Sequence, residues 1–432
     1  MRAAFFFVLF LVGVCGITRR RLVDQLFPDG ESSVTEERFG DSCFLAAEQA
    51  FVGSALADGS GSVYVFDLDE DTETWSLGQV LEGDDNDDSL FGFAVFQDSS
   101  VLLVGAPGSD QVGFYELNDG DWELSWILNP PAFEIIGTQY GYSVAMDGDI
   151  IAVGAPSQLV GVETSGAVYI FDRDLATDPD FPQWGLRTEL SLSPDERETG
   201  DLFGASVWVA GDYVFVGAPG RNSSAGAVYV FQRDEGGSDE WGQIAVIQPS
   251  FLDANEYFGA SISTDEEVVA IGAPTTGDNF GAAYIYYQEE DDSFTFVQII
   301  AGKNPQTGDY FGEELGVIGS FVYVGAMGND DTSGNNREDE GAVFLFFRDK
   351  GGEDNWGRIQ TIAPDYHDDD DDDEADDNDE SLDNFGSCVG TNGDYLLAGA
   401  AGHTDDVGSA YIFGTVHSSA NSLSSSLLRF FF

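Results

Sequence analysis

The chain has 432 residues, and its 16 Lys plus Arg against 79 Asp plus Glu give a formal net charge of −63 at pH 7. This excess excludes nucleic-acid binding through the phosphates and argues against docking on anionic lipid, because both need clustered cations. Hydrophobic residues at 42% and aromatic residues at 13% exclude disorder throughout, and the 53 Gly, 34 Phe and 16 Tyr favour an all-β fold with many tight turns.

The first sixteen residues predict a cleaved secretory signal peptide. They read MRAAFFFVLFLVGVCG, which is one Arg followed by an apolar run and small residues. The run is shorter than the roughly 20 apolar residues that a spanning helix needs. Residues 17–21 follow as a basic flank, and residues 417–432 are expected to form a flexible tail. We therefore expect a secreted protein, extracellular or at the cell surface, without a transmembrane segment.

Seven internal repeats occupy residues 22–416, with starts near 39, 91, 140, 203, 258, 311 and 385. Each repeat opens on an aromatic–Gly pair, and a Gly-small pair follows with its glycine always 13 residues after the first one. Seven recurrences at one spacing indicate a repeat architecture. The paired glycines are Gly40 and Gly53, Gly92 and Gly105, Gly141 and Gly154, Gly204 and Gly217, Gly259 and Gly272, Gly312 and Gly325, and Gly386 and Gly399.

Each repeat contains up to four short segments rich in Val, Ile, Tyr and Phe, as strands are. The fourth usually begins with Trp, at Trp75, Trp122, Trp184, Trp241 and Trp356. Four strands repeated radially are typical of a β-propeller, so the sequence predicts seven blades of four antiparallel strands. The seventh repeat lacks a fourth strand, whereas LVDQLF at residues 22–27 resembles one. We expect this amino-terminal strand to complete the last blade, which removes two open sheet edges.

The repeated small and aromatic residues are interpreted as structural. Glycine permits close backbone approach and positive φ, and the aromatic before it is expected to pack as a wedge between blades. Serines recur three residues after the aromatic, and we expect them to bond backbone groups. They are Ser42, Ser143, Ser206 and Ser261.

Two cysteines fall in the first and last repeats. Cys388 takes the serine position of repeat seven, and Cys43 lies one position further along in repeat one. Repeats one and seven are neighbours in a closed ring, and side chains one apart on a strand point to opposite faces, as facing blades require. A disulfide across the closure is therefore allowed, and two separate buried thiols are the alternative.

A sequon at Asn222 in a polar loop is a candidate for glycosylation.

Acidic clusters are the candidate metal sites. An unbroken run from Asp368 to Asp373 continues to Glu380. Such a run is typical of a solvated loop, and the alternative is weak, multivalent calcium binding. Loops 82–90, 156–165, 327–340 and 365–384 are expected on one rim of the disc. The other candidate ligands are Asp67, Asp69, Asp71 and Glu73, and Asp84, Asp85, Asp87 and Asp88.

The repeats resemble FG-GAP repeats, the units of the integrin α-subunit propeller. Four of the Gly-small pairs read GAP outright, at 105–107, 154–156, 217–219 and 272–274. The resemblance covers residues 22–416 and implies an extracellular interaction platform, commonly in cell adhesion, with calcium cages between the two motifs. Here those turns are as short as QDSS at 97–100, without room for five oxygen ligands, so cages at the family position are expected to be absent.

The main hypothesis is a secreted, monomeric, non-enzymatic module that binds an extracellular protein or glycan, with calcium as a low-affinity aid. The rival is an extracellular hydrolase with a carboxylate or metal site at the propeller mouth. Carboxylates are so abundant in this chain that their spacing in the sequence does not identify a catalytic pair. A third interpretation treats the charge as adaptation to saline surroundings.

Overall fold

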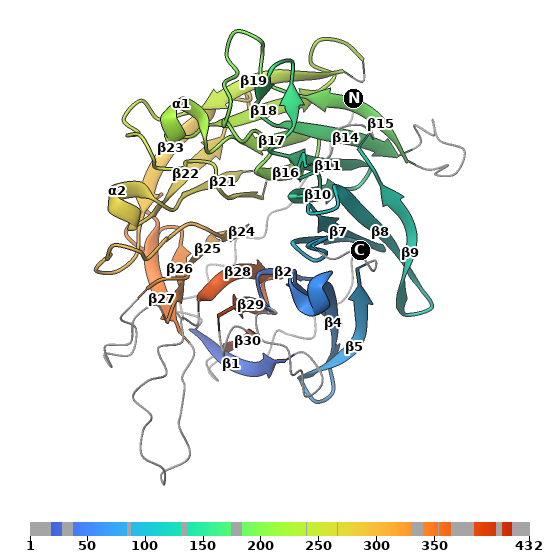
Figure 1. The fold of residues 1–432 in the computed structure, drawn as a ribbon. Coiled ribbons are helices and arrows are strands. Elements are labelled where there is room, and N and C mark those ends of the chain that lie inside the picture. The colour runs from blue at the N-terminus through green and yellow to red at the C-terminus, as the bar shows by residue number, and fades with distance from the viewer. Residues whose placement is uncertain are drawn as a thin grey trace, which may run out of the picture.

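The computed structural model describes residues 19–27, 38–83, 88–130, 137–173, 184–238, 240–265, 267–329, 340–352, 354–363, 384–402 and 408–416. Within these residues, seven four-stranded antiparallel sheets surround a common axis, as Figure 1 shows. The sequence-based prediction of a seven-bladed β-propeller is confirmed. No helix in these ranges is long and apolar enough to cross a membrane.

Each sheet is one blade, and its strands are given from the innermost outwards. Blade 1 consists of β2 (Ser42–Leu45), β3 (Gln49–Ser54), β4 (Ser62–Asp69) and β5 (Thr74–Glu82). Blade 2 consists of β6 (Ala94–Asp98), β7 (Val101–Ala106), β8 (Gln111–Asn118) and β9 (Asp121–Leu128). Blade 3 consists of β10 (Ser143–Asp147), β11 (Ile150–Ala155), β14 (Ala167–Arg173) and β15 (Trp184–Leu190). Blade 4 consists of β16 (Ser206–Ala210), β17 (Tyr213–Gly217), β18 (Val228–Arg233) and β19 (Trp241–Ile247). Blade 5 consists of β20 (Ile262–Thr264), β21 (Val268–Ala273), β22 (Ala282–Gln288) and β23 (Phe294–Ile300). Blade 6 consists of β24 (Leu315–Ile318), β25 (Phe321–Ala326), β26 (Ala342–Phe347) and β27 (Gly357–Ile362). Blade 7 consists of β28 (Phe385–Thr391), β29 (Tyr395–Ala400), β30 (Ser409–Val416) and β1 (Arg19–Leu26).

The remaining elements lie in loops between second and third strands. They are the hairpin of β12 (Leu159–Val160) and β13 (Glu163–Thr164), the 3₁₀ turn η1 (Ala57–Gly59), and the short turns α1 (Arg221–Ser224) and α2 (Thr276–Asn279).

The amino-terminal strand closes the ring, as the sequence predicts. β1 pairs with β30 in antiparallel register, and Leu26 lies opposite Ala410. The strand begins at Arg19 rather than at Leu22, because Arg19 to Arg21 continue the pairing along residues 414–416. Part of the predicted basic flank therefore belongs to the last blade.

The constant spacing of 13 residues has a direct structural cause. The backbone N–H of Gly40 donates to the carbonyl of Gly53 across the first hairpin, at 2.9 Å, and the same bond joins the paired glycines of blades 2 to 6. The second glycine of each pair also contacts the next blade. A Cβ on Gly53 would lie 2.1 Å from the carbonyl oxygen of Gly92, and all seven blade-to-blade contacts, the closing contact of Gly399 with Gly40 included, are this tight. Glycine is required there because the two backbones touch.

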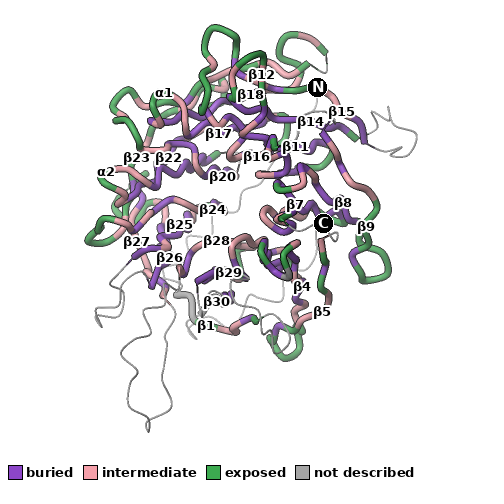
Figure 2. The backbone as a smooth tube through the Cα atoms, viewed as in Figure 1, coloured by how far each residue is buried: buried purple, intermediate pink, exposed green. Residues whose placement is uncertain are grey.

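The aromatic residue of each pair packs between blades, which confirms the wedge interpretation. Phe203, with no exposed surface, lies in a cluster that joins the strands of blades 3 and 4. Its ring contacts Tyr229 edge-on at a centroid distance of 5.6 Å, and its backbone bridges to Gly166 of the preceding blade. Figure 2 shows the same distribution around the ring, with buried residues in the blades and exposed residues in the peripheral loops.

The recurring serines bond backbone groups of the following blade. Ser143 Oγ donates to the carbonyl oxygen of Gly204 at 2.9 Å, and Ser42, Ser206 and Ser261 make the equivalent bonds. In blade 7 the bond comes from Ser387, one residue earlier, at 2.8 Å from the Gly40 oxygen. Blades 2 and 6 carry Ala94 and Glu314 at the serine position.

Candidate functional site

One face of the disc gathers the loops that join second to third strands and the loops that lead into each aromatic–Gly pair. We call it the loop face. The two kinds of loop contact each other between consecutive blades: Asp110 accepts a hydrogen bond from Thr138 Oγ1 at 2.7 Å, and Thr164 in the β12–β13 hairpin accepts one from the Gly200 N–H at 2.8 Å. These contacts show a shared rim for the loops of blades 2 to 4, whereas residues 84–87, 330–339 and 364–383 of the other predicted loops lie outside the described residues.

Half-buried side chains meet at the propeller axis on this face. They occupy the position directly after each aromatic–Gly pair, where the chain enters the innermost strand. Innermost strands contact their neighbours around the ring, so this position surrounds the axis. We define the axial cluster as Asp41, Phe93, Tyr142 and Glu313 at this position, together with the adjacent Arg38 and Glu314.

The aromatic part of the axial cluster comes from blades 2 and 3. The Phe93 and Tyr142 rings lie 4.7 Å apart between centroids, tilted by 46°. Both side chains keep partial exposure, unlike the fully buried Tyr140 two positions before Tyr142. The pair therefore keeps ring surface open to solvent instead of filling the core.

Carboxyl groups on other blades complete the axial cluster. Glu313 and Glu314 belong to blade 6, yet their charges act on Tyr142 in blade 3 and, together with burial, raise the pKa of its hydroxyl. Arg38 Nη2 lies 3.0 Å from Asp41 Oδ1 in an ion pair. Acidic and aromatic groups from blades 6 and 3, far apart in sequence, therefore interact across the axis.

All three carboxyl groups of the cluster hold protons more tightly than free side chains do, and burial raises the pKa of Glu313. Shielding by the surrounding strands raises the pKa of Glu314 from 4.5 to about 8, and neighbouring Glu313 adds to the rise. Burial raises the pKa of Asp41 from 3.8 to about 6, and the Arg38 guanidinium limits that rise. At neutral pH the cluster thus contains a carboxylic acid that can donate a hydrogen bond.

The candidate calcium ligands in the first blade serve its hairpin. Asp67 Oδ1 accepts a hydrogen bond from Gln49 Nε2 at 2.8 Å, and Asp69 Oδ1 accepts the backbone N–H groups of Asp71 and Thr72 at 2.9 and 3.2 Å. Glu73 takes a positive φ of 55° in the turn. In the part of the chain that the structure describes, no three His, Cys, Asp or Glu side chains gather to hold a metal.

The other acidic candidates fall mostly outside the described residues. Asp84, Asp85, Asp87 and the run 368–380 are among them, and Asp88 is exposed with a φ of 69°. Calcium binding by these loops stays a prediction.

Asn222 is exposed in α1 with a φ of 53°, where a glycan would meet no steric obstacle from the core, and its glycosylation stays a prediction as well.

Cys43 and Cys388 are joined by a disulfide, with a Cα–Cα distance of 5.7 Å. The bond links β2 of blade 1 to β28 of blade 7, next to the axis. Of the two alternatives that the sequence leaves open, the structure therefore shows the cross-link.

Comparisons with known proteins agree with this architecture. A model of the FG-GAP repeat matches residues 137–171, 187–231 and 241–286. Integrin alpha-M of Mus musculus is 27% identical over 270 residues, which cover 56% of this chain and 22% of the integrin. The chain thus matches about a fifth of that relative's length.

Two solved structures share the fold at low sequence identity. A protein from Bacteroides uniformis, provisionally assigned as a 6-phosphogluconolactonase, superposes with a TM-score of 0.54 at 12% identity and covers 79% of this chain and 88% of its own. A protein from Lactobacillus plantarum gives 0.50 at 13% identity, with coverages of 78% and 88%. These likenesses concern the fold alone.

The closed ring of seven four-stranded sheets places this protein among the β-propellers. More particularly, the repeats at residues 137–171, 187–231 and 241–286 match the FG-GAP repeat, and the ring resembles the FG-GAP propeller of the integrin α subunits.

The axial cluster was not predicted from the sequence. Four of its six members share only the position after the aromatic–Gly pair, and that position varies among repeats, from Asp41 and Phe93 to Ala205 and Glu313. The sequence signal that could have found it is the variation of this position among the repeats. An accessible position that varies on a repeated scaffold is one where binding specificity can be set.

Proposed function

We propose that this protein is an extracellular, adhesion-type module that binds a protein or glycan partner on its loop face, at the axial cluster. The observation that carries the proposal is the tilted Phe93–Tyr142 pair beside Asp41, Glu313 and Glu314 on a covalently closed ring. Likeness to an integrin α propeller supports an interaction role and an extracellular setting.

The chemistry of the axial cluster favours a cationic group of the partner. An ammonium or guanidinium group gains from the face of an aromatic ring and from nearby carboxylates. The large negative charge of the chain also steers cations towards it and slows anionic competitors.

Binding arrays of extracellular-matrix proteins and glycans test the proposal, with the whole protein as the probe. We expect Phe93→Ala and Tyr142→Ala to weaken binding about tenfold or more, as loss of a central aromatic contact does. Leu124→Ala provides the control, because Leu124 is 52% exposed on the outer strand of blade 2. Equal binding by all three variants would remove the axial cluster as the site.

Calcium assistance is part of the same proposal. Repeating the arrays with calcium and then with a chelator, and measuring calcium uptake by calorimetry at low salt, tests it directly. We expect uptake in the millimolar class that extracellular acidic sites show, and a reduction after deletion of residues 368–380.

A second candidate is a hydrolase that uses the axial carboxyl groups. The raised pKa of Glu314 favours it, since a carboxylic acid that stays protonated at neutral pH is suited to general acid catalysis. A screen against glycans and phosphodiesters, with Glu314→Gln beside the natural protein, distinguishes this candidate. Turnover that the substitution abolishes would favour the enzyme over the binding module.

A further inference from the structure

The contacts between the outer strands of consecutive blades, here called outer seams, follow a common pattern. The Trp that begins a fourth strand packs against the preceding blade: Trp122 of blade 2 contacts Phe51 of blade 1 edge-on, with centroids 5.6 Å apart. Trp75, Trp184 and Trp356 are likewise at most 6% exposed. The indole therefore fills the outer part of these seams.

A paired hydrogen bond holds several of the same seams. Gln79 of blade 1 donates its amide to the Trp122 carbonyl and accepts the Trp122 N–H, both at 2.8 Å. Gln298 of blade 5 makes the same two bonds to Trp356 of blade 6, at 2.9 and 3.0 Å. At the closing seam, Asp24 accepts the N–H of Trp75 at 3.1 Å.

At the seam between blades 4 and 5 the paired hydrogen bond is absent, and the ring that contacts the preceding blade is a phenyl instead of an indole: Phe294 packs edge-on to Phe215 with centroids 5.8 Å apart. Phe294 begins the fourth strand of blade 5 in place of Trp and is only half-buried. Ala245 occupies the place of Gln79 and Gln298, four residues after Trp241, and its methyl group cannot make the paired bond. A groove of about 630 Å³ lies along this seam, lined by both Ala245 and Phe294.

The groove has polar and apolar lining in about equal parts and runs beside an open strand edge. Residues 244–249 line it without interruption, so side chains of both orientations contribute, and it follows the edge of β19 rather than one face. β19 is the last strand of its sheet. Apolar side chains here remain uncovered: Val246 is 44% exposed, Phe251 56% and Phe296 42%.

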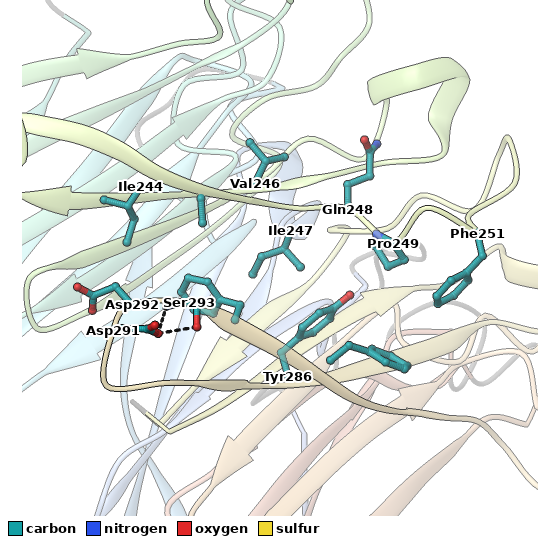
Figure 3. A pocket seen from close by; sticks show the side chains of 13 residues that line it. Ile244, Val246, Ile247, Gln248, Pro249, Phe251, Tyr286, Asp291, Asp292 and Ser293 are labelled. Atoms are coloured by element: carbon teal, nitrogen blue, oxygen red, sulfur yellow. Dashed lines mark hydrogen bonds between the residues drawn. The ribbon is translucent and has the colours of Figure 1, made fainter.

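The two ends of the groove differ in chemistry, as Figure 3 shows. Asp291 and Asp292 lie near Ile244 at one end, and Phe251 lies at the other. Phe251 packs on Phe296 with centroids 6.0 Å apart. Hydrogen bonds from Ser293 lower the pKa of Asp291, so this end carries negative charge at neutral pH.

We propose that this groove binds an extended peptide segment of a partner protein, with aromatic or aliphatic side chains at one end and basic side chains at the other. Such a segment can hydrogen-bond to the open edge of β19, place its apolar side chains beside Phe251 and Phe296, and present its cations to Asp291 and Asp292. Charge complementarity decides the class of occupant, because the chain repels acidic segments. The inference goes beyond the proposed function, since this site lies on the outer circumference, away from the axial cluster.

Fluorescence anisotropy with a labelled peptide, Thr-Phe-Thr-Phe-Arg-Lys, tests the proposal on the full-length protein. The double substitution Ala245→Gln/Phe294→Trp restores the residues found at other outer seams, so it fills the groove with groups that the fold already accommodates. We expect it to weaken binding of the peptide about tenfold or more. Asp291→Asn/Asp292→Asn should weaken it severalfold and flatten its dependence on salt.

Matched peptides and variants define the outcomes. Thr-Phe-Thr-Phe-Glu-Glu and Thr-Ser-Thr-Ser-Arg-Lys should each bind about tenfold more weakly, because one loses the charge and the other the apolar side chains. Phe93→Ala at the axis should leave peptide binding unchanged, which separates this site from the proposed axial one. Undiminished binding by the filled variant would overturn the proposal. So would displacement of the peptide by a neutral glycan, or a concentration-dependent dimer that the same double substitution dissolves.

Discussion

The seam that closes the ring and the seam between blades 4 and 5 use the same scaffold in opposite ways. At the closure, blade 7 and blade 1 are joined by the Cys43–Cys388 disulfide and by the bond from the Trp75 N–H to Asp24. Between blades 4 and 5 the outer seam has Phe294 and Ala245 instead of an indole and an amide. The inner contact, however, is alike in both, because the glycine pairs touch at both seams. The comparison teaches that the inner contacts fix the ring, while the outer seams are free to vary.

Removing the disulfide is expected to have the largest effect on this comparison. The bond spans 345 residues of sequence, and its loss in Cys43→Ser/Cys388→Ser should lower the free energy of unfolding by about 3–5 kcal/mol. Denaturant titration with and without reductant measures it. Reductant should lower the midpoint of the natural protein and leave that of the variant unchanged; an equal midpoint for both proteins would show that pairing of β1 with β30 alone closes the ring.

Adding a methyl group at the inner glycines compares the two seams directly. The new Cβ in Gly399→Ala would lie 2.0 Å from the Gly40 oxygen, and in Gly217→Ala 2.1 Å from the Gly259 oxygen. We expect a loss of about 3 kcal/mol at the closure and about 1–2 kcal/mol between blades 4 and 5, where the open outer seam lets the blades separate.

Thermal denaturation measures both losses. Gly316→Ala is the control, since its Cβ would have 3.9 Å to the nearest side-chain atom. Equal losses at the two seams would show that the outer seam does not relieve inner crowding.

Removing the paired hydrogen bond at a closed outer seam should make it resemble the open one. Gln298→Ala deletes two bonds to the Trp356 backbone, and we expect the free energy of unfolding to fall by about 1–2 kcal/mol. Chemical denaturation beside Gln243→Ala, an exposed glutamine of β19, gives the measurement and its control. A loss no larger than that of the control would mean that the indole alone holds the seam.

The smallest expected effect is a pH dependence at the contact between blades 6 and 7, where Glu314 occupies the serine position. Its pKa is about 8 in the folded protein against 4.5 as the ordinary value. Between these values the folded chain retains a proton that the unfolded chain has released, so stability falls as the pH rises towards 8.

Glu314→Gln should remove that fall and raise stability at pH 9 relative to pH 5 by about 1 kcal/mol, less than the full shift corresponds to, because solvent screens the partly exposed side chain. Urea titrations at the two pH values measure it. Glu290→Gln, at an exposed turn, is the control for the loss of one charge. Parallel pH profiles for the natural protein and Glu314→Gln would contradict the assignment.

The sequence predicted the features that each repeat encodes by itself. The spacing of 13 residues reflects one hydrogen-bonded hairpin, and the match of residues 22–27 to other fourth strands predicted the closure. The disulfide followed from the neighbour relation of the first and last repeats and from the parity of Cys43 and Cys388.

The two sites depend on relations between repeats, which no single repeat encodes. The axial cluster combines Tyr142 with Glu313 from across the ring, and charge counting had directed attention to acidic loops instead. The groove lies where two adjacent repeats depart from the pattern of the other seams, with Ala245 in place of Gln and Phe294 in place of Trp. The missing Trp at Phe294 was visible in the sequence, but only the register shows that Ala245 faces the same seam.

The closure by β1 also sets an order of events during synthesis. β1 leaves the ribosome before every other strand, whereas its partner β30 leaves after all of them. The first-made strand must therefore wait with its hydrogen-bonding groups unpaired until β30 has been synthesised, and the finished ring forms only afterwards.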